Sequence, residues 1–119
     1  MLDDNKGPRY GEVHEANLDP ALGAETGKTR PVLIVSNDIS NRYSSTVTVL
    51  PITGKPLRKE YPFEVAVPAN TAGLSVASRV KANQIRTLDK QRLVGFRGVL
   101  PQEYLVKINR ALRIHLNIT

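Results

Sequence analysis

The sequence predicts a mainly β fold with helices (α+β), in which a small barrel or strongly curved sheet is closed by one C-terminal amphipathic helix. Segments rich in Val, Ile and Thr recur at short spacing between Gly and Pro turn signals, as strands of a compact β-structure do. Only the last segment repeats its apolar residues at helical spacing. The 119 residues suffice for one compact domain and not for two.

Six segments have the composition of strands. Residues 1–8 precede them and are expected to be flexible, so that residues 9–119 form a single domain. The expected strands are Glu12–Leu18, Val32–Ser36, Thr46–Ile52, Phe63–Val67, Ser78–Gln84 and Leu93–Leu100.

Two segments are predicted to be helical. Apolar side chains of the last segment, Ile108 among them, recur on one helical face. Pro101 is expected at the first position of this helix, where a missing N–H costs nothing. A shorter helix is expected over residues 38–43, capped by Asn37 or Asp38.

The composition excludes several classes of protein. With no cysteine, the chain can form no disulfide, no thiolate metal site and no thiol nucleophile. His14 and His115 lie far apart in the sequence and do not by themselves make a zinc site. No apolar run approaches the ~18 residues of a membrane span, and the acidic, polar first residues are not a secretory signal. These features favour a cytoplasmic protein without membrane contact.

The charge of the chain is uneven. Seventeen Lys and Arg against eleven Asp and Glu give a formal net charge of +6, and the excess falls entirely after residue 30. A basic body favours an anionic partner, either nucleic acid or an acidic protein segment.

One predicted loop is unusual. Residues 21–30 lie between Pro20 and Pro31, contain Gly23 and Gly27, and show no apolar periodicity. Loops of this length are uncommon in compact domains and are often functional or mobile. The loop is therefore a candidate site, with a plain connection between strands as the alternative.

At this loop the sequence resembles the MazF/PemK family, toxins of bacterial toxin–antitoxin pairs. The matching pieces follow one another in order from Gly11 to the final helix, which makes the set specific although each piece alone is weak. They are Leu18-Asp19-Pro20, Gly23 to Leu33, Ser36-Asn37-Asp38-Ile39, Pro51-Ile52-Thr53, Tyr61-Pro62-Phe63-Glu64-Val65, Gln84-Ile85-Arg86-Thr87 and Asp89-Lys90-Gln91-Arg92-Leu93.

The resemblance implies a homodimer of SH3-like barrels that cleaves single-stranded RNA at short sequences, with no metal or other cofactor. It also implies a MazE-like antitoxin whose acidic C-terminal segment covers the RNA groove, and contact with operator DNA only through that antitoxin. By position, Arg30 matches the family's catalytic arginine, Thr53 its catalytic threonine and Glu25 a loop acid. Two residues depart from the common pattern: Thr26 stands where many members have Gln, and His14 where Trp or Tyr is common.

The implied chemistry needs no nucleophile from the protein, since the ribose 2′-hydroxyl can attack the adjacent phosphorus. The guanidinium of Arg30 suits two phosphate oxygens, and the Thr53 hydroxyl can donate to a developing oxyanion. An arginine stays protonated in proteins and is a poor base. Glu25 is the nearest candidate base in sequence, and His14 is the alternative because histidine changes charge near neutral pH.

The remaining candidates are RNA contacts. Gln84 and Arg86 are two positions apart, so in a regular strand they would share a face. Basic residues before Tyr61 could follow the RNA backbone while that ring stacks on a base. The full set of predicted RNA-binding residues is Lys28, Thr29, Asn37, Lys55, Arg58, Tyr61, Gln84, Arg86 and His14.

Two other functions fit the same fold. A non-enzymatic toxin of the same superfamily poisons DNA gyrase through a tail that ends with tryptophan, but this chain contains no tryptophan. A catalytically inactive RNA-binding module would bind RNA with strong salt dependence and leave it intact.

Overall fold

The structure, a computed structural model, describes residues 7–54 and 59–119. The expected flexible N-terminus falls mostly on residues outside these ranges, as do the predicted RNA contacts Lys55 and Arg58. Along the described chain the elements are β1 (Glu12–Asn17), β2 (Thr29–Ile34), α1 (Asp38–Tyr43), β3 (Thr46–Thr53), β4 (Glu64–Val67), β5 (Ser78–Lys81), η1 (Ala82–Gln84), β6 (Arg86–Asp89), η2 (Lys90–Arg92), β7 (Leu93–Val99) and α2 (Gln102–Leu116).

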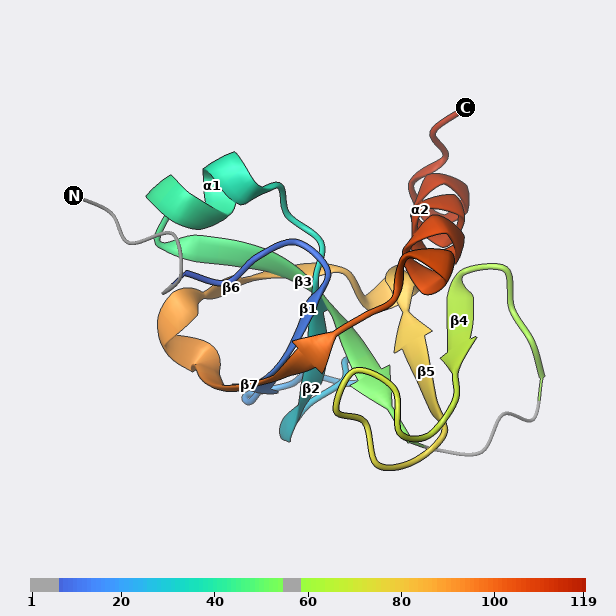
Figure 1. Ribbon diagram of the computed structural model, residues 1–119, viewed down its shortest axis with the longest axis horizontal. Helices are drawn as coiled ribbons and strands as arrows, with labels where there is room; N and C mark the ends of the chain where they lie inside the picture. Colours follow the sequence, from blue (N-terminus) through green and yellow to red (C-terminus); the bar gives the residue numbers. More distant parts are fainter. Residues whose placement is uncertain (1–6, 55–58) are drawn as a thin grey trace.

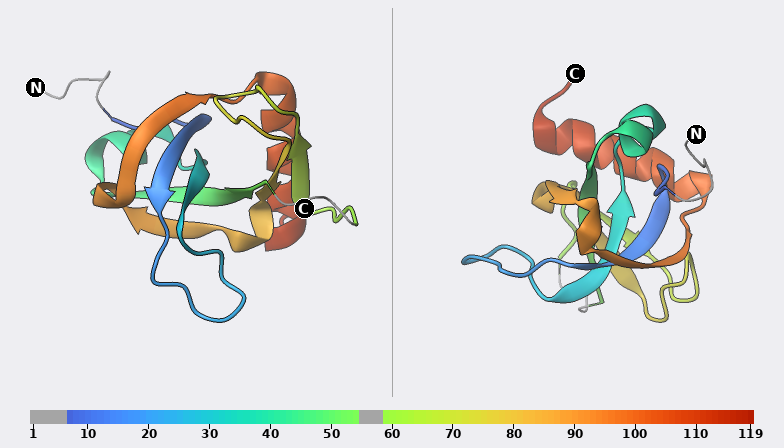
Figure 2. Two further views of the ribbon diagram at one scale, coloured as in Figure 1. Left: turned by 90° about the horizontal axis from the view of Figure 1, so that it is seen from below. Right: turned by 90° about the vertical axis from the view of Figure 1, so that its left-hand side faces the viewer.

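The strands form one strongly curved antiparallel sheet in the order β4-β5-β3-β2-β1-β7, with β6 also paired to β3. The sheet curls so that its two ends face each other across the molecule, and the loop between β1 and β2 projects from its side (Figure 2). The expected mainly β fold with a C-terminal helix is confirmed. Among the described residues the strand pairing does not close on itself, so of the two expected forms, a small barrel or a strongly curved sheet, the structure has the curved sheet.

Two successive strands, β5 and β6, pair with the same edge of β3. β5 pairs Val80 with Ile52, and β6 pairs Arg86 with Val49. From Val80 to Arg86 the chain advances by six positions, whereas their partners Ile52 and Val49 are only three positions apart on β3. The three additional positions equal the length of η1. The prediction of a continuous strand over residues 78–84 is wrong, because a 3₁₀ turn interrupts it and β6 follows.

β2 and β3 are buried on both faces. Alternate residues of these strands point to opposite sides of the sheet and enter two separate apolar clusters. The helix-side core contains Val13, Leu33, Leu50, Ile52, Val65, Val67, Leu74, Val80, Ala82, Leu100, Leu105, Ile108 and Ala111. The loop-side core contains Ala16, Leu18, Val32, Ile34, Val47, Val49 and Leu88.

Helix α2 packs against β4 and η1 and covers the end of the sheet that holds β4 and β5 (Figure 1). It begins at Gln102, so Pro101 precedes the helix as its N-cap instead of occupying the expected first position. It ends at Leu116 and is followed by the C-cap Asn117, whose backbone is left-handed at φ 57°. Within the part of the chain that the structure describes, no helix is long and apolar enough to cross a membrane.

Helix α1 confirms the prediction made from its cap. Asn37 is the N-cap, and its side chain accepts a hydrogen bond from the N–H of Ser40 at 2.8 Å. This contact satisfies one of the N–H groups that a helix leaves without an internal partner.

Candidate active site

Arg30 and Thr53 occupy equivalent positions on neighbouring strands. The β2–β3 ladder pairs Val32 with Pro51, and each of the two residues lies two positions beyond this pair, which places both on the same face of the sheet. The β2–β3 ladder ends at the pair Val32–Pro51. Pro51 in this pair and the adjacent Pro31 have no N–H to donate. Thr53 is buried at 4% exposure, and Arg30 is half-buried. The place where β2 and β3 part is therefore the candidate site.

The loop between β1 and β2, residues 18–28, is folded tightly at its base. The N–H of Leu18 donates to Lys28 O at 2.8 Å, and the N–H of Lys28 donates to Asp19 Oδ1 at 2.7 Å. A Cβ on Gly27 would lie 2.7 Å from Asp19 Oδ1, so this close approach requires glycine. The Nε of Arg30 donates to Gly27 O at 2.8 Å. The loop base and the arginine thus hold each other in place.

Glu25 lies near the exposed tip of the loop. Its Oε1 accepts a hydrogen bond from the N–H of Leu22 at 2.7 Å, and its own N–H donates to Leu22 O at 3.2 Å. One carboxylate oxygen is therefore used to close the turn at the tip. Glu25 also lines a pocket of about 440 Å³ between the loop and the η1–β6 segment, together with Ala24 and residues 83–86.

Gln84 and Arg86 contact the loop from the other side of this pocket. Gln84 is the last residue of η1 and Arg86 the first of β6, so the expectation that they share one strand face is wrong. The side chain of Gln84 hydrogen-bonds the backbone of Ala24 and Thr26, and Arg86 Nη1 donates to Leu18 O at 3.2 Å.

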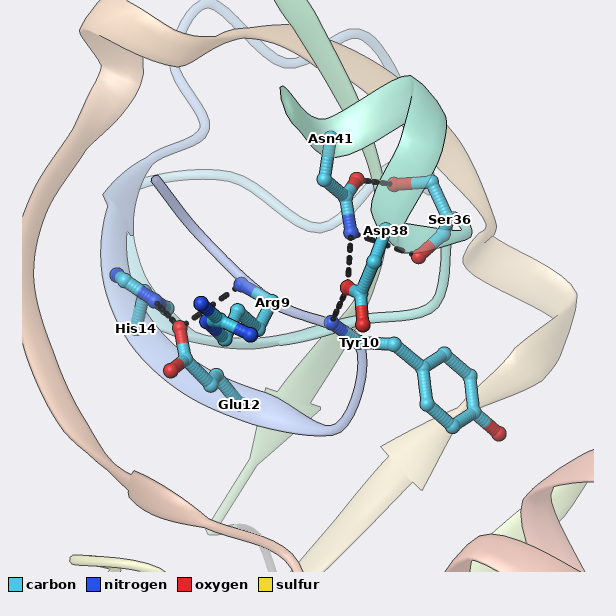
Figure 3. Close-up of polar contacts among 7 residues, drawn as sticks. All are labelled: Arg9, Tyr10, Glu12, His14, Ser36, Asp38 and Asn41. Carbon is cyan, nitrogen blue, oxygen red and sulfur yellow. Dashed lines mark hydrogen bonds and ion pairs between the residues drawn. The ribbon is translucent and has the colours of Figure 1, made fainter. Parts of the chain in front are cut away.

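His14 lies on the same sheet face as Arg30, because β1 pairs His14 with Val32 and Ala16 with Arg30. Its Nε2 is 2.9 Å from Glu12 Oε1, the oxygen that also accepts the N–H of Arg9 (Figure 3). Its ring meets Phe96 edge-on with centroids 5.6 Å apart. The imidazole is thus held between a carboxylate and an aromatic ring, on the face that the resemblance assigns to RNA.

A second set of polar contacts lies around the start of α1, next to His14 and Glu12 (Figure 3). Asn41 is buried and donates from Nδ2 to Ser36 O at 2.8 Å and to Asp38 Oδ1 at 3.3 Å. The same Asp38 oxygen accepts the N–H of Tyr10 at 2.7 Å (Figure 3). These contacts attach α1 to the segment that enters β1.

The other predicted RNA contacts are distributed over the surface. Lys28 and Thr29 are exposed at the end of the loop and the start of β2. Asn37 is exposed but uses its side-chain oxygen to cap α1. Tyr61 stacks on Phe63 with centroids 5.1 Å apart, and Lys59 Nζ lies 5.4 Å from the centre of the Tyr61 ring.

Two arginines next to the site, Arg92 and Arg79, had no role in the sequence analysis. Arg92 Nη1 donates to the carbonyl oxygens of Asn17 and Asp19 and so holds the first arm of the loop. Arg79 is the β5 partner of Thr53 and forms an ion pair with Glu64 at 2.8 Å. Their positions depend on strand pairing between distant segments, for which the sequence contains no local signal.

Known proteins with similar sequences are toxins and endoribonucleases. The family model described as PemK-like, MazF-like toxin of type II toxin–antitoxin system matches residues 9–116. Endoribonuclease EndoA of Bacillus subtilis is 41% identical over 108 residues, which cover 91% of this chain and 93% of EndoA. Endoribonuclease MazF9 of Mycobacterium tuberculosis is 36% identical over 115 residues, which cover 92% and 97% of the two chains.

Solved structures share the fold. MazF from Deinococcus radiodurans superposes with a TM-score of 0.82 at 29% identity, covering 94% of this chain and 98% of that one. A mycobacterial endoribonuclease, solved in complex with its cognate antitoxin, superposes with a TM-score of 0.77 at 28% identity, covering 94% and 97%. The chain therefore belongs to the family of PemK-like, MazF-like toxins of type II toxin–antitoxin systems.

Proposed function

We propose that this protein is the toxin of a toxin–antitoxin pair and a cytoplasmic endoribonuclease that cleaves single-stranded RNA without a metal ion. The observation that carries the proposal is the register of β2 and β3, which brings Arg30 and Thr53 to one face beside a tightly folded loop. The named relatives EndoA and MazF9 are endoribonucleases, which supports the same activity here.

In the proposed reaction the ribose 2′-oxygen attacks the adjacent phosphorus. A bond forms between these two atoms, the bond from phosphorus to the 5′-oxygen breaks, and the products are a 2′,3′-cyclic phosphate and a free 5′-hydroxyl. Arg30 neutralises the charge on the phosphate oxygens through its terminal guanidinium nitrogens, because its Nε is engaged by Gly27 O. Thr53 donates its hydroxyl to a phosphate oxygen from a nearly buried position, so the donor needs little reorganisation.

Two proton transfers complete the reaction. We assign acceptance of the 2′-proton to Glu25, which is one of the residues lining the pocket beside the loop. The departing 5′-oxygen takes up a proton from Arg30 or from water. His14 is the less favoured base, since its Nε2 is already held by Glu12.

The proposed RNA path follows the exposed positive charge next to the pocket. Lys28 and Thr29 lie at the end of the loop, Arg86 lines the pocket, and His14 lies on the same face as Arg30. Single-stranded RNA can present a phosphate to the arginines while its bases are splayed. Tyr61 and Asn37 are assigned to the edge of this path.

We further propose that the toxin is a homodimer inhibited by a MazE-like antitoxin. An acidic, poorly ordered segment of such a partner can fold onto the basic face and exclude RNA by charge and by overlap. The complex of a mycobacterial relative with its cognate antitoxin supports this arrangement. Operator DNA is contacted through the antitoxin in this proposal.

The test is RNA cleavage in the presence of EDTA by the wild-type protein, Arg30→Ala and Thr53→Ala. Arg110→Ala is the matched control, since Arg110 is exposed on α2. We expect wild type and the control to release 2′,3′-cyclic phosphate ends, and each site variant to turn over about 10²–10³-fold more slowly. Equal cleavage by all variants would reject the assigned site, and intact RNA with wild type would reject the enzyme.

A further inference from the structure

The middle of the β1–β2 loop is attached to a part of the chain almost sixty residues away. Gln84 Oε1 accepts the N–H of Thr26 at 3.2 Å, and Gln84 Nε2 donates to Ala24 O at 3.5 Å. One side-chain amide therefore contacts the residues on both sides of Glu25.

The hydrogen bonds of Gln84 are a third point at which the exposed β1–β2 loop is held, in addition to its base and its tip. The base is closed by Leu18, Asp19 and Lys28, and the tip by the turn at Leu22, whose side chain is 82% exposed. Between base and tip, the backbone of residues 24–26 meets the body of the protein through Gln84.

The position of Gln84 follows from the three-residue insertion between β5 and β6. In a continuous strand this side chain would follow the alternation of the sheet. The 3₁₀ turn η1 removes the residue from the ladder and places it against the loop. Arg86 and Arg92, further along the same segment, hold the first arm of the loop through backbone carbonyl oxygens.

We propose that Gln84 is a positioning residue that sets the place of Glu25 by holding Ala24 and Thr26, an inference that rests on the proposed RNA cleavage. The amide of Gln84 is engaged by the loop backbone, so its part in the reaction is to order the loop instead of reading a base. Loss of this contact leaves RNA binding largely intact and lowers the fraction of complexes in which Glu25 is in place.

The test compares two substitutions of Gln84 in the full-length protein. Gln84→Met keeps the length of the side chain and removes both hydrogen bonds. Gln84→Glu keeps an oxygen that can accept the N–H of Thr26. Gln102→Met, at the exposed start of α2, is the matched control.

Four quantities are measured at an ionic strength that screens the added charge of Gln84→Glu. They are kcat and KM on an RNA oligonucleotide that wild type cleaves, Kd for the same oligonucleotide with a 2′-deoxyribose at the cleavage site, and hydrogen–deuterium exchange of the loop.

Gln84→Met is expected to lower kcat about tenfold, to change KM and Kd by less than about twofold, and to speed exchange at Thr26 about tenfold. Gln84→Glu is expected to restore kcat to within about threefold of wild type. Gln102→Met should behave as wild type.

A higher Kd with unchanged loop exchange would overturn the proposal in favour of direct RNA contact by Gln84. Unchanged exchange in Gln84→Met would overturn it whatever the kinetics, and so would failure of Gln84→Glu to restore kcat. If wild type does not cleave RNA, the proposed function fails, while the exchange rates still show whether Gln84 holds the loop.

Discussion

The two cores of this small protein share strands but differ in what covers them. The helix-side core is covered by α2, whose buried residues Leu105, Ile108 and Ala111 add apolar surface to it. The loop-side core contains fewer residues and lies next to Arg30, Arg86 and the β1–β2 loop.

The two faces of the sheet therefore contribute differently to the stability of the fold and to the candidate site. Because alternate residues of β2 and β3 enter opposite cores, the same strands can be anchored by the helix on one face and present polar groups on the other. The helix-side core should therefore determine the stability of the fold, and the loop-side core should in addition determine the geometry of the candidate site.

The largest expected effect comes from truncating one residue in each core. Ile108→Ala and Leu88→Ala each create a cavity at a side chain exposed by 2% or less, and each should lower the free energy of unfolding by about 2–5 kcal/mol. Urea denaturation measures this loss.

Turnover per folded molecule then distinguishes the two cores. It should stay at the wild-type value in Ile108→Ala and fall in Leu88→Ala, because Leu88 lies on the strand that carries Arg86. Equal turnover in the two variants would show that the loop-side core has no special influence on the site.

Two ion pairs allow a second comparison. Glu64–Arg79 is mostly buried, with side-chain exposures of 8% and 16%, whereas Glu15–Arg97 is exposed by 28% and 30%. Glu64→Gln leaves a guanidinium without its counter-charge beside Thr53 and should lower the free energy of unfolding by about 2–4 kcal/mol. Glu15→Gln should cost about 1 kcal/mol or less. Similar losses in urea denaturation would contradict the burial argument.

A third comparison uses two carboxylates that accept backbone N–H groups at the same distance. Asp19 Oδ1 accepts Lys28 N and Asp38 Oδ1 accepts Tyr10 N, each at 2.7 Å. Asp19→Ala and Asp38→Ala should each lower the free energy of unfolding by about 1–3 kcal/mol. RNA cleavage should fall in Asp19→Ala alone, since that carboxylate closes the loop beside Arg30. A larger activity loss in Asp38→Ala would point to the start of α1 as part of the site.

The smallest effects are expected at two left-handed residues. Lys28 has φ 65° and Asn117 has φ 57°, and glycine adopts this conformation without a steric cost. Lys28→Gly and Asn117→Gly should each change the free energy of unfolding by less than about 1 kcal/mol. RNA affinity should weaken in Lys28→Gly alone. The dependence of the logarithm of its RNA-binding constant on the logarithm of the salt concentration should also become shallower, because one phosphate contact is lost. Unchanged affinity would remove Lys28 from the RNA path.

Predictions from the sequence were accurate where local chemistry decides the structure. A helix over residues 38–43 with Asn37 or Asp38 as its N-cap was expected because capping needs only a side-chain oxygen and a nearby N–H. The structure has this helix, with Asn37 as the cap. The predictions were inaccurate where pairing between strands distant in the sequence determines the structure. β2 spans Thr29–Ile34 and includes Pro31, whereas the expected strand spanned Val32–Ser36. The break at η1 is set by the register along β3, which no local pattern records.

The sequence by itself determined the amphipathic C-terminal helix, the short capped helix, the glycine-containing loop and the family resemblance that singles out Arg30 and Thr53. Each depends on residues close together in the chain or on an ordered motif. Only the tertiary structure decided that two cores share β2 and β3, that Arg30 and Thr53 fall on one face, and that Gln84 holds the loop. These features depend on strand register, and a shift of one residue in that register would turn each side chain of the strand to the opposite face.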